Sequence, residues 1–182
     1  MTDLLVLDLV NKGLVTDQMV LTVGYDIENL TDPARRARYH GAIEKDPYGR
    51  ELPKQAHGSI NLDGHTSSTR KIMCAVSELF DRIVDKNLLV RRMYVVANHV
   101  LPEADVPKKN DGVVQLNLFT DYAAEEEKQK AEDAALERER KIQKAALAIK
   151  KKYGKNAILK AMNLEEGATT KGRNAQIGGH KA

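Results

Sequence analysis

The sequence predicts an α+β fold, in which an incomplete β-α-β-β-α-β unit is followed by a long charged helix and a tail. Over residues 3–97, the hydrophobic patterns of helix, strand, strand, helix and strand follow one another. Residues 101–122 then have the Pro, Asn, Asp and Gly content of a linker. Residues 123–152 lack Gly and Pro and are rich in helix formers. We therefore expect a domain at 1–100, a linker at 101–122, and a charged helix with a flexible basic tail at 123–182.

The first expected helix covers residues 3–12, with Thr2 as its cap and Gly13 as its stop. A strand is the competing interpretation, because the segment is apolar nearly all round. Residues 18–26 alternate as a strand that places Met19, Leu21, Val23 and Tyr25 on one face.

A hairpin is expected in the long connection that follows this strand. Asp46-Pro47-Tyr48-Gly49 has proline second and glycine fourth, which is typical of a type I turn. The turn joins two short strands, at 41–45 and 50–53.

The second half of the domain contains a strand, a helix and a strand. Residues 57–62 alternate as a short strand. Thr66-Ser67-Ser68-Thr69 opens the clearest helix, with apolar residues at three- and four-residue spacing up to Ile83. Residues 88–97 form a strand that Arg91 and Arg92 interrupt, and neighbouring residues of a strand point to opposite faces.

This order of elements lacks the first strand of a complete β-α-β-β-α-β unit. We expect that strand to have lain in the interior of the sheet, next to 88–97, so that its place stays open. Residues 113–119 alternate and are the best substitute. The missing strand also predicts that the chain is a fragment whose Met1 is an internal methionine of a longer protein.

Composition and charge exclude several classes of protein. No apolar run approaches the roughly 20 residues of a membrane helix, and no signal peptide follows Met1, so we expect a cytoplasmic protein without a membrane partner. The single cysteine, Cys74, excludes an internal disulfide. Residues 1–100 carry 13 basic and 13 acidic side chains, whereas residues 123–182 carry 14 basic and 9 acidic ones, which indicates a basic extension.

No constellation of catalytic or metal-binding residues is evident. Asp26 and Glu28 follow a strand at a spacing of two, and Asp8 could approach from the neighbouring helix, but a solvated strand end explains them better than two-metal chemistry. The histidines and the cysteine show no metal-ligand spacing. We therefore predict no catalytic residue, metal, cofactor or small-molecule substrate in this chain.

Three groups of residues are candidate contacts to DNA phosphates. The first is the helix start, whose hydroxyls and free amides suit a phosphate, although plain helix capping explains them equally well. The second is the arginine pair of the last strand, and the third is a run of arginines in the long connection. The residues are Thr66, Ser67, Ser68, Arg70 and Lys71; Arg91 and Arg92; and Arg35, Arg36 and Arg38.

The linker contains an apolar pentapeptide, Gln115-Leu116-Asn117-Leu118-Phe119, that has no evident core to enter. An external groove is a favourable destination for such side chains, because burying each one gains roughly 1.5–3 kcal/mol. An additional edge strand packed on the domain is the alternative. Q-L-x-L-F resembles the motif by which bacterial replication and repair proteins bind the sliding clamp, with Gln115, Leu116, Leu118 and Phe119 at its specified positions.

Most of the chain resembles one family. The segments that carry the resemblance are LVTDQMVLTVGYDIENL (14–30), HGSINL (57–62), TSSTR (66–70), ELFDRIVDKNLLVRR (78–92), KKYGKNAILKAMNLEEGATT (151–170) and NAQIGGHKA (174–182). In this order, they are similar to the C-terminal part of bacterial Y-family translesion DNA polymerases of the ImpB/MucB/SamB (UmuC-like) type. The clamp motif falls where that family carries it.

The resemblance implies that residues 1–100 are most of a little-finger domain, which contacts template–primer DNA during DNA repair and translesion synthesis in the SOS response. The palm, with its catalytic carboxylates and Mg²⁺, would precede Met1, so this chain is expected to be inactive alone. Two alternatives remain open. The chain is a stand-alone clamp- or DNA-binding adaptor, or it is an unrelated split-βαβ interaction module with an accidental QLNLF.

Overall fold

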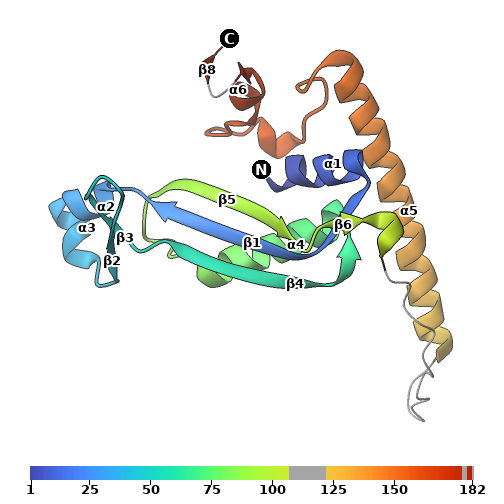
Figure 1. The fold of residues 1–182 in the computed structure, drawn as a ribbon, viewed down its shortest axis with the longest axis horizontal. Coiled ribbons are helices and arrows are strands. Elements are labelled where there is room, and N and C mark those ends of the chain that lie inside the picture. The colour runs from blue at the N-terminus through green and yellow to red at the C-terminus, as the bar shows by residue number, and fades with distance from the viewer. Residues whose placement is uncertain (107–121, 178–179, 182) are drawn as a thin grey trace. The chain divides into compact units, whose positions relative to one another are not determined.

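The structure is a computed structural model that describes residues 1–106, 122–177 and 180–181, and it confirms an α+β protein (Figure 1). The chain divides into two compact units. Residues 14–105, together with Thr2, form the first, which we call the sheet unit. Met1, residues 3–13 and the described part of 106–182 form the second, which we call the helical unit. The domain boundaries expected from the sequence stay predictions.

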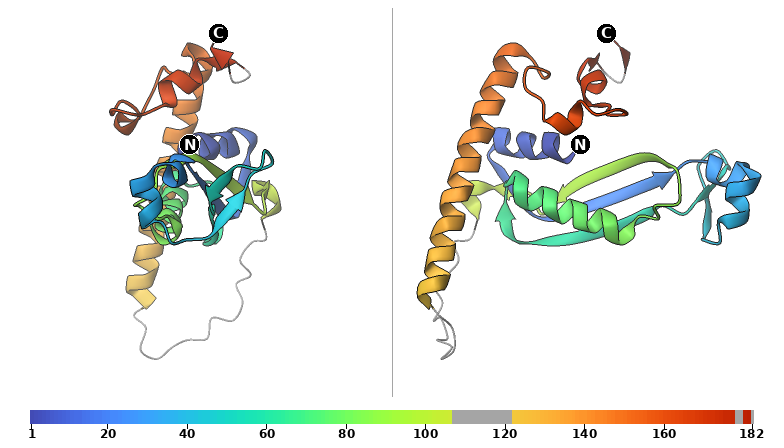
Figure 2. Two further views of the ribbon diagram at one scale, coloured as in Figure 1. Left: turned by 90° about the vertical axis from the view of Figure 1, so that its left-hand side faces the viewer. Right: turned by 180° about the vertical axis from the view of Figure 1, so that it is seen from behind.

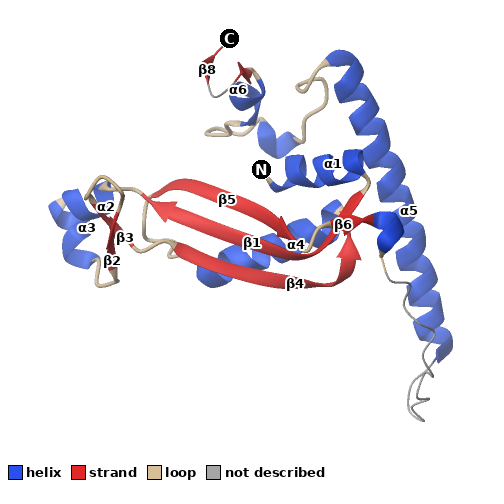
Figure 3. Ribbon diagram, in the orientation of Figure 1, coloured by secondary structure: helices blue, strands red, loops and turns tan. Residues whose placement is uncertain are grey.

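Three long antiparallel strands form the sheet, in the order β4-β1-β5 (Figure 3). They are β1 (Leu14–Tyr25), β4 (Ala56–Thr66) and β5 (Val90–Asn98). The short strand β6 (Leu101–Pro102) also pairs with β1, and a 3₁₀ helix, η1 (Glu103–Asp105), follows it. Helix α4 (Thr69–Ile83) connects β4 to β5 and lies along one face of the sheet (Figure 2).

Alternation along β1 creates the core of the sheet unit. Met19, Leu21, Val23 and Tyr25 are at most 5% exposed, as the sequence pattern predicts. Leu21, Val23 and Tyr25 pack in one cluster with Leu79 of α4. Gly58 of β4 permits this close approach, because a Cβ there would lie 3.1 Å from side-chain atoms of both Leu79 and Ile83.

In the described part of the chain, β5 keeps the unpaired edge that we expected, but this edge lies at the outside of the sheet and not in its interior. β1 fills the interior position between β4 and β5 and pairs with both. Hydrophobic periodicity identifies strands but not their neighbours, so the sequence did not indicate that β1 lies between β4 and β5. Among the described residues, β5 pairs on one side only, so its unpaired edge is the outer edge of the sheet. The proposed substitute strand, 113–119, lies outside the described residues.

A small lobe at one end of the sheet contains the predicted hairpin (Figure 1). Its strands are β2 (Ile43–Lys45) and β3 (Glu51–Pro53), and the N–H of Gly49 bonds to the carbonyl of Asp46 across the turn at 2.9 Å. Two short helices, α2 (Glu28–Thr31) and α3 (Pro33–Arg38), belong to the same lobe. The hairpin is confirmed, whereas the helices were not predicted.

Helix α4 begins and packs as the sequence indicates. Ser68 is its N-cap, and the Ser68 hydroxyl accepts a hydrogen bond from the N–H of Lys71 at 3.2 Å. Ile72, Val76 and Leu79 are buried at helical spacing, whereas Cys74 is exposed. Thr66 belongs to β4 rather than to the helix, and its hydroxyl accepts from the N–H of Ser68.

The helical unit contains α1 (Thr2–Lys12), α5 (Tyr122–Tyr153) and a tail. Gly13 ends α1 in the left-handed conformation, at φ 66°, as predicted, but Met1 rather than Thr2 is the N-cap. The tail contains η2 (Ala161–Asn163), α6 (Thr170–Asn174) and the paired strands β7 (Gln176–Ile177) and β8 (His180–Lys181). None of the helices in the described part of the chain has the length and apolar composition needed to cross a membrane.

Truncation of Leu79 should destabilise the sheet unit, because this fully buried side chain joins α4 to β1 and β4. We expect Leu79→Ala to lower the free energy of unfolding by about 2–5 kcal/mol, which urea titration followed by circular dichroism would measure. Cys74→Ala, on the exposed side of the same helix, is the control and should change it by less than about 0.5 kcal/mol. Equal effects of the two substitutions would contradict this account of the core.

Candidate nucleic-acid interface

A β-bulge next to the hairpin lobe brings the two arginines of β5 to the same place. Gly24 pairs with Arg92, whereas Tyr25 pairs with Val90, so Arg91 is the extra residue. A bulge interrupts the alternation of side chains along a strand. Both arginines line one cavity at this bulge, although neighbouring residues of a regular strand point to opposite faces.

Neighbouring residues position the two guanidinium groups. A Cβ on Gly24 would lie 3.1 Å from Cγ of Arg92, so the glycine makes room for this side chain. The Arg92 guanidinium lies 5.6 Å from the ring centroid of Tyr94, within the range of a cation–π contact. Arg91 Nη1 is 3.9 Å from Asp26 Oδ2, a long and exposed ion pair that leaves most of the arginine's charge available.

The hairpin forms the second wall of the cavity, and Asp46 organises its turn. The Asp46 carboxylate accepts hydrogen bonds from the N–H groups of Tyr48 and Arg50, each at 2.9 Å, and from Arg50 Nε at 2.7 Å. Arg50 Nη2 lies 2.6 Å from the same carboxylate. The Arg50 guanidinium also lies 5.3 Å from the ring centroid of Tyr48. The turn therefore uses the negative charge of Asp46 internally.

These contacts favour the ionised form of Asp46. Burial of the carboxyl opposes ionisation, but the hydrogen bonds from the backbone and side chain of Arg50 and from the backbone of Tyr48 outweigh it, so the pKa of Asp46 is lowered.

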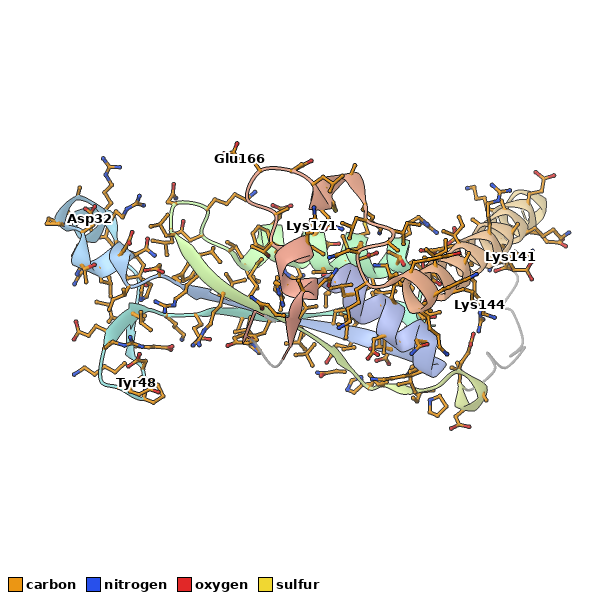
Figure 4. The ribbon with its side chains drawn as sticks, turned by 90° about the horizontal axis from the view of Figure 1, so that it is seen from above. Asp32, Tyr48, Lys141, Lys144, Glu166 and Lys171 are labelled. Carbon is orange, nitrogen blue, oxygen red and sulfur yellow. The ribbon has the colours of Figure 1, made fainter. Side chains whose placement is uncertain are left out.

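The cavity between the hairpin and the bulge has a volume of about 330 Å³. Its basic lining residues are Lys45, Arg50, Arg91 and Arg92, and its acidic ones are Glu44 and Asp46. Ile27, Leu52 and Pro53 add an apolar wall. Figure 4 labels Tyr48 on the hairpin and Asp32 at the start of α3, in the same lobe. Since Arg50 neutralises Asp46, the cavity carries a net positive charge.

A buried asparagine fastens the lobe to β5. The side-chain amide of Asn29 donates hydrogen bonds to the carbonyls of Asp26 and Leu89, each at 2.9 Å, and its oxygen accepts from the N–H of Leu89 at 2.9 Å. Asn29 is 0% exposed. These bonds hold α2 beside the segment that precedes the two arginines.

Arg35, Arg36 and Arg38 are exposed on α3 rather than in the loop that we expected. Asp32 caps this helix by accepting hydrogen bonds from the N–H groups of Ala34 and Arg35. Pro33 at the first helical position supports the same start, because its ring presets the helical φ. The three arginines therefore belong to the same lobe as the hairpin.

The candidate residues at the start of α4 lie elsewhere. Thr66 pairs with Thr16 near the beginning of β1, whereas Ala56 pairs with Val23 near the end of β1 that adjoins the lobe. Thr66, Ser67, Ser68, Arg70 and Lys71 are thus separated from the cavity by the length of β4, and the structure does not bring the two groups together. Ser68 is buried as the helix cap, whereas Arg70 is exposed.

The face of the sheet opposite the α4 core carries polar residues on both sides of an apolar pair, Val20 and Val96, of which Val96 is 48% exposed. Gln18 bonds to Asn61 on one side and to Asn98 on the other, at 2.8 Å and 3.0 Å. Thr22 Oγ1 lies 2.9 Å from His57 Nδ1. Tyr94, which pairs with Thr22, is 49% exposed on this face. A solvated face that carries both hydrogen-bonding groups and an exposed aromatic ring is compatible with contact to a polar polymer.

Several cavity residues were not identified from the sequence, notably Lys45, Arg50 and Tyr48 of the hairpin. A single charged residue beside a turn does not indicate a binding site in the sequence, because the site forms only when the turn packs next to a strand. The Arg92-x-Tyr94 spacing was a usable signal, since two residues at that spacing share a face.

The remaining sequence candidates show no catalytic arrangement. The clamp-motif residues Gln115, Leu116, Leu118 and Phe119 lie outside the described residues. Asp8 pairs with Lys12 within α1 at 2.6 Å, and Asp26 accepts a hydrogen bond from the N–H of Glu28 at 3.0 Å. Within residues 1–106 and 122–177, no group of three or more His, Cys, Asp and Glu side chains is arranged to hold a metal ion.

Comparison with protein-family models, curated proteins and solved structures gave no match to this chain.

Acid should open the hairpin selectively. The pKa of Asp46 is lower in the folded state than in the unfolded state, so the ionised carboxylate stabilises the fold. This contribution is complete at pH values above the unfolded pKa of about 3.9, and it is lost as the pH falls through the folded pKa. We expect amide exchange at Gly49 to report hairpin opening below about pH 4 once intrinsic exchange is corrected for. Asp46→Asn should remove this pH dependence, whereas Glu44→Gln, in the neighbouring strand, should keep it. An unchanged profile in Asp46→Asn would contradict the assignment.

Proposed function

We propose that the sheet unit binds template–primer DNA through its phosphates, as the little-finger domain of a Y-family translesion polymerase. In this proposal, Gln115, Leu116, Leu118 and Phe119 bind the sliding clamp. Nucleotide transfer and its Mg²⁺ belong to the other domains of such a polymerase, and no catalytic residue is assigned to this chain. The proposal rests on the family resemblance of the sequence and on the cluster of cations at the hairpin end of the sheet.

The single observation that carries the DNA-binding proposal is the bulge that places Arg91 and Arg92 in one cavity with Lys45. Among the described residues, neither Arg92 nor Lys45 forms an ion pair within 4 Å, so their charges are not consumed by the fold. Guanidinium groups suit phosphate oxygens because they offer two parallel donors. Arg35, Arg36 and Arg38 add positive charge to the same lobe.

Sequence-independent contact with the DNA backbone fits this arrangement better than base reading. The cations lie at a bulge and on short elements, and in the sheet unit the one long helix, α4, uses its apolar face for the core. Phosphate contacts position a duplex without specifying its sequence. Arg70 and Lys71 at the start of α4 form a second, separate phosphate contact in this proposal.

Neutralising the bulge arginines should weaken binding to DNA. For the full chain, we expect Arg92→Gln to reduce affinity for a template–primer duplex roughly tenfold, and to reduce the slope of log affinity against log salt by about one, because one phosphate contact is lost. Fluorescence anisotropy at several salt concentrations would measure both effects.

Lys86→Gln is the matched control, because it removes one positive charge near the C-terminal end of α4, where Lys86 pairs with Asp81 at 2.7 Å. It should leave the affinity within about twofold, since an exposed ion pair of this kind contributes little. An equal loss of DNA affinity in both variants would show that only the net charge of the protein matters, and it would contradict a binding site at the bulge.

Alanine substitution of the apolar clamp-motif residues should remove most clamp binding. Leu118→Ala with Phe119→Ala deletes two side chains of the kind that dominate small interfaces, so we expect at least a tenfold loss in surface plasmon resonance with a bacterial sliding clamp. Asn117→Ala, at the unspecified position of the motif, is the control. Unchanged affinity in the double variant would refute the clamp assignment without bearing on DNA binding.

A further inference from the structure

We infer that the cavity between the hairpin and the β5 bulge binds a single nucleotide unit, with its phosphate on Arg91 and Arg92 and its base against the apolar wall. This inference deepens the proposed DNA binding, and it rests on that proposal where the nucleotide belongs to a DNA strand. It assigns a ligand class to the cavity itself rather than to the exposed cations around it.

The charge balance of the cavity selects an anion. Asp46 is occupied by the turn, where the N–H groups of Tyr48 and Arg50 and the Arg50 guanidinium all bond to its carboxylate. Glu44 is then the remaining acidic lining residue against Lys45, Arg91 and Arg92. A group of cations within one concave site lowers the free energy of a bound phosphate more than a flat surface does, because the low-dielectric walls focus the field.

The size and the apolar wall select a ligand larger than phosphate. A volume of about 330 Å³ lies at the lower end of the range for small-molecule sites, roughly 300–1,000 Å³. Ile27 and Leu52 are only half-buried and offer apolar surface to a flat ring, whereas Pro53 is buried. The lining also includes arginine side chains, whose guanidinium planes stack on aromatic rings. A base attached to a phosphate suits both the apolar residues and the arginines.

The local architecture makes the site preorganised. Asn29 fastens α2 to the segment before β5 by two hydrogen bonds of 2.9 Å with the backbone of Leu89, and Ile27 directly precedes this helix. Tyr39 of the lobe donates its hydroxyl to the carbonyl of Ala42, at the base of the hairpin. The walls are therefore held by buried or local hydrogen bonds before a ligand arrives, which reduces the entropic cost of binding.

The first test is an NMR titration of the full, wild-type chain with dAMP, deoxyadenosine and inorganic phosphate. We expect dAMP to shift the amide signals of Gly24, Leu52 and Arg92. Deoxyadenosine and phosphate should each bind roughly tenfold or more weakly, because each makes only half of the contacts. Equal affinity for phosphate alone, or shifts confined to other parts of the chain, would overturn the inference.

The second test fills the cavity. Leu52→Trp places a large ring in the apolar wall and should abolish dAMP binding. Ile43→Trp changes the neighbouring strand β2 at a residue that does not line the cavity, and it should retain dAMP binding. Retained dAMP binding in Leu52→Trp would overturn the inference. Should that variant fail to fold, the wild-type titration still decides.

DNA probes distinguish a nucleotide of a DNA strand from a free nucleotide. They also test the proposed function and this inference independently of each other. If a duplex with one unpaired 2-aminopurine binds more tightly than the fully paired duplex, the cavity holds a nucleotide of a DNA strand. If the two duplexes bind equally and dAMP also binds, the cavity holds a free nucleotide. Ile43→Trp, at a residue outside the cavity lining, should bind the fully paired duplex like the wild type. Duplex binding without dAMP binding refutes only this inference, whereas dAMP binding without duplex binding refutes only the proposed function.

Discussion

The pairing of β1 on both of its edges is the constraint on which the sheet unit depends. Strand β1 pairs with both β4 and β5, and its buried side chains form the sheet side of the core. Tyr25 at its end is buried, and its hydroxyl accepts a hydrogen bond from the N–H of Asp85, which joins the segment after α4 to the sheet. Because β4 and β5 both run antiparallel to β1, they run parallel to each other, and a crossover helix must connect them. Helix α4 is that crossover, and its apolar stripe closes the core.

The candidate site depends on a departure from this regular ladder. A perfectly alternating β5 would have divided Arg91 and Arg92 between the two faces, with one of them directed toward the core side. The bulge instead brings both to the lining of a single cavity. Bulges are common beside functional sites because they redirect side chains at little cost to the rest of the sheet. Gly24 on the paired strand leaves space for Arg92, so two strands cooperate in the arrangement.

The site contains two kinds of charged residues. Some of them form ion pairs with each other, and the others remain available to a ligand. Asp46 and Arg50 satisfy each other within one turn. Lys45 and Arg92 have no comparable partner among the described residues, and Arg91 has only a distant one. Desolvating an unpaired cation is costly, and Lys45, Arg91 and Arg92 are accordingly exposed to water. Their exposure is consistent with a surface on which an anionic ligand replaces bound water.

The sequence by itself determined the α+β class, the face of β1 that is buried, the turn of the hairpin, and the start and buried stripe of α4. Each of these follows from local preferences: alternation, proline and glycine in a turn, or a serine cap. Only the tertiary structure decided that β1 lies inside the sheet, that Arg91 is the extra residue of a bulge, and that Lys45 and Arg50 line the same cavity as Arg91 and Arg92. The reason is physical, because strand order and bulges are set by contacts between segments distant in the chain, which leave no periodic trace in either segment alone.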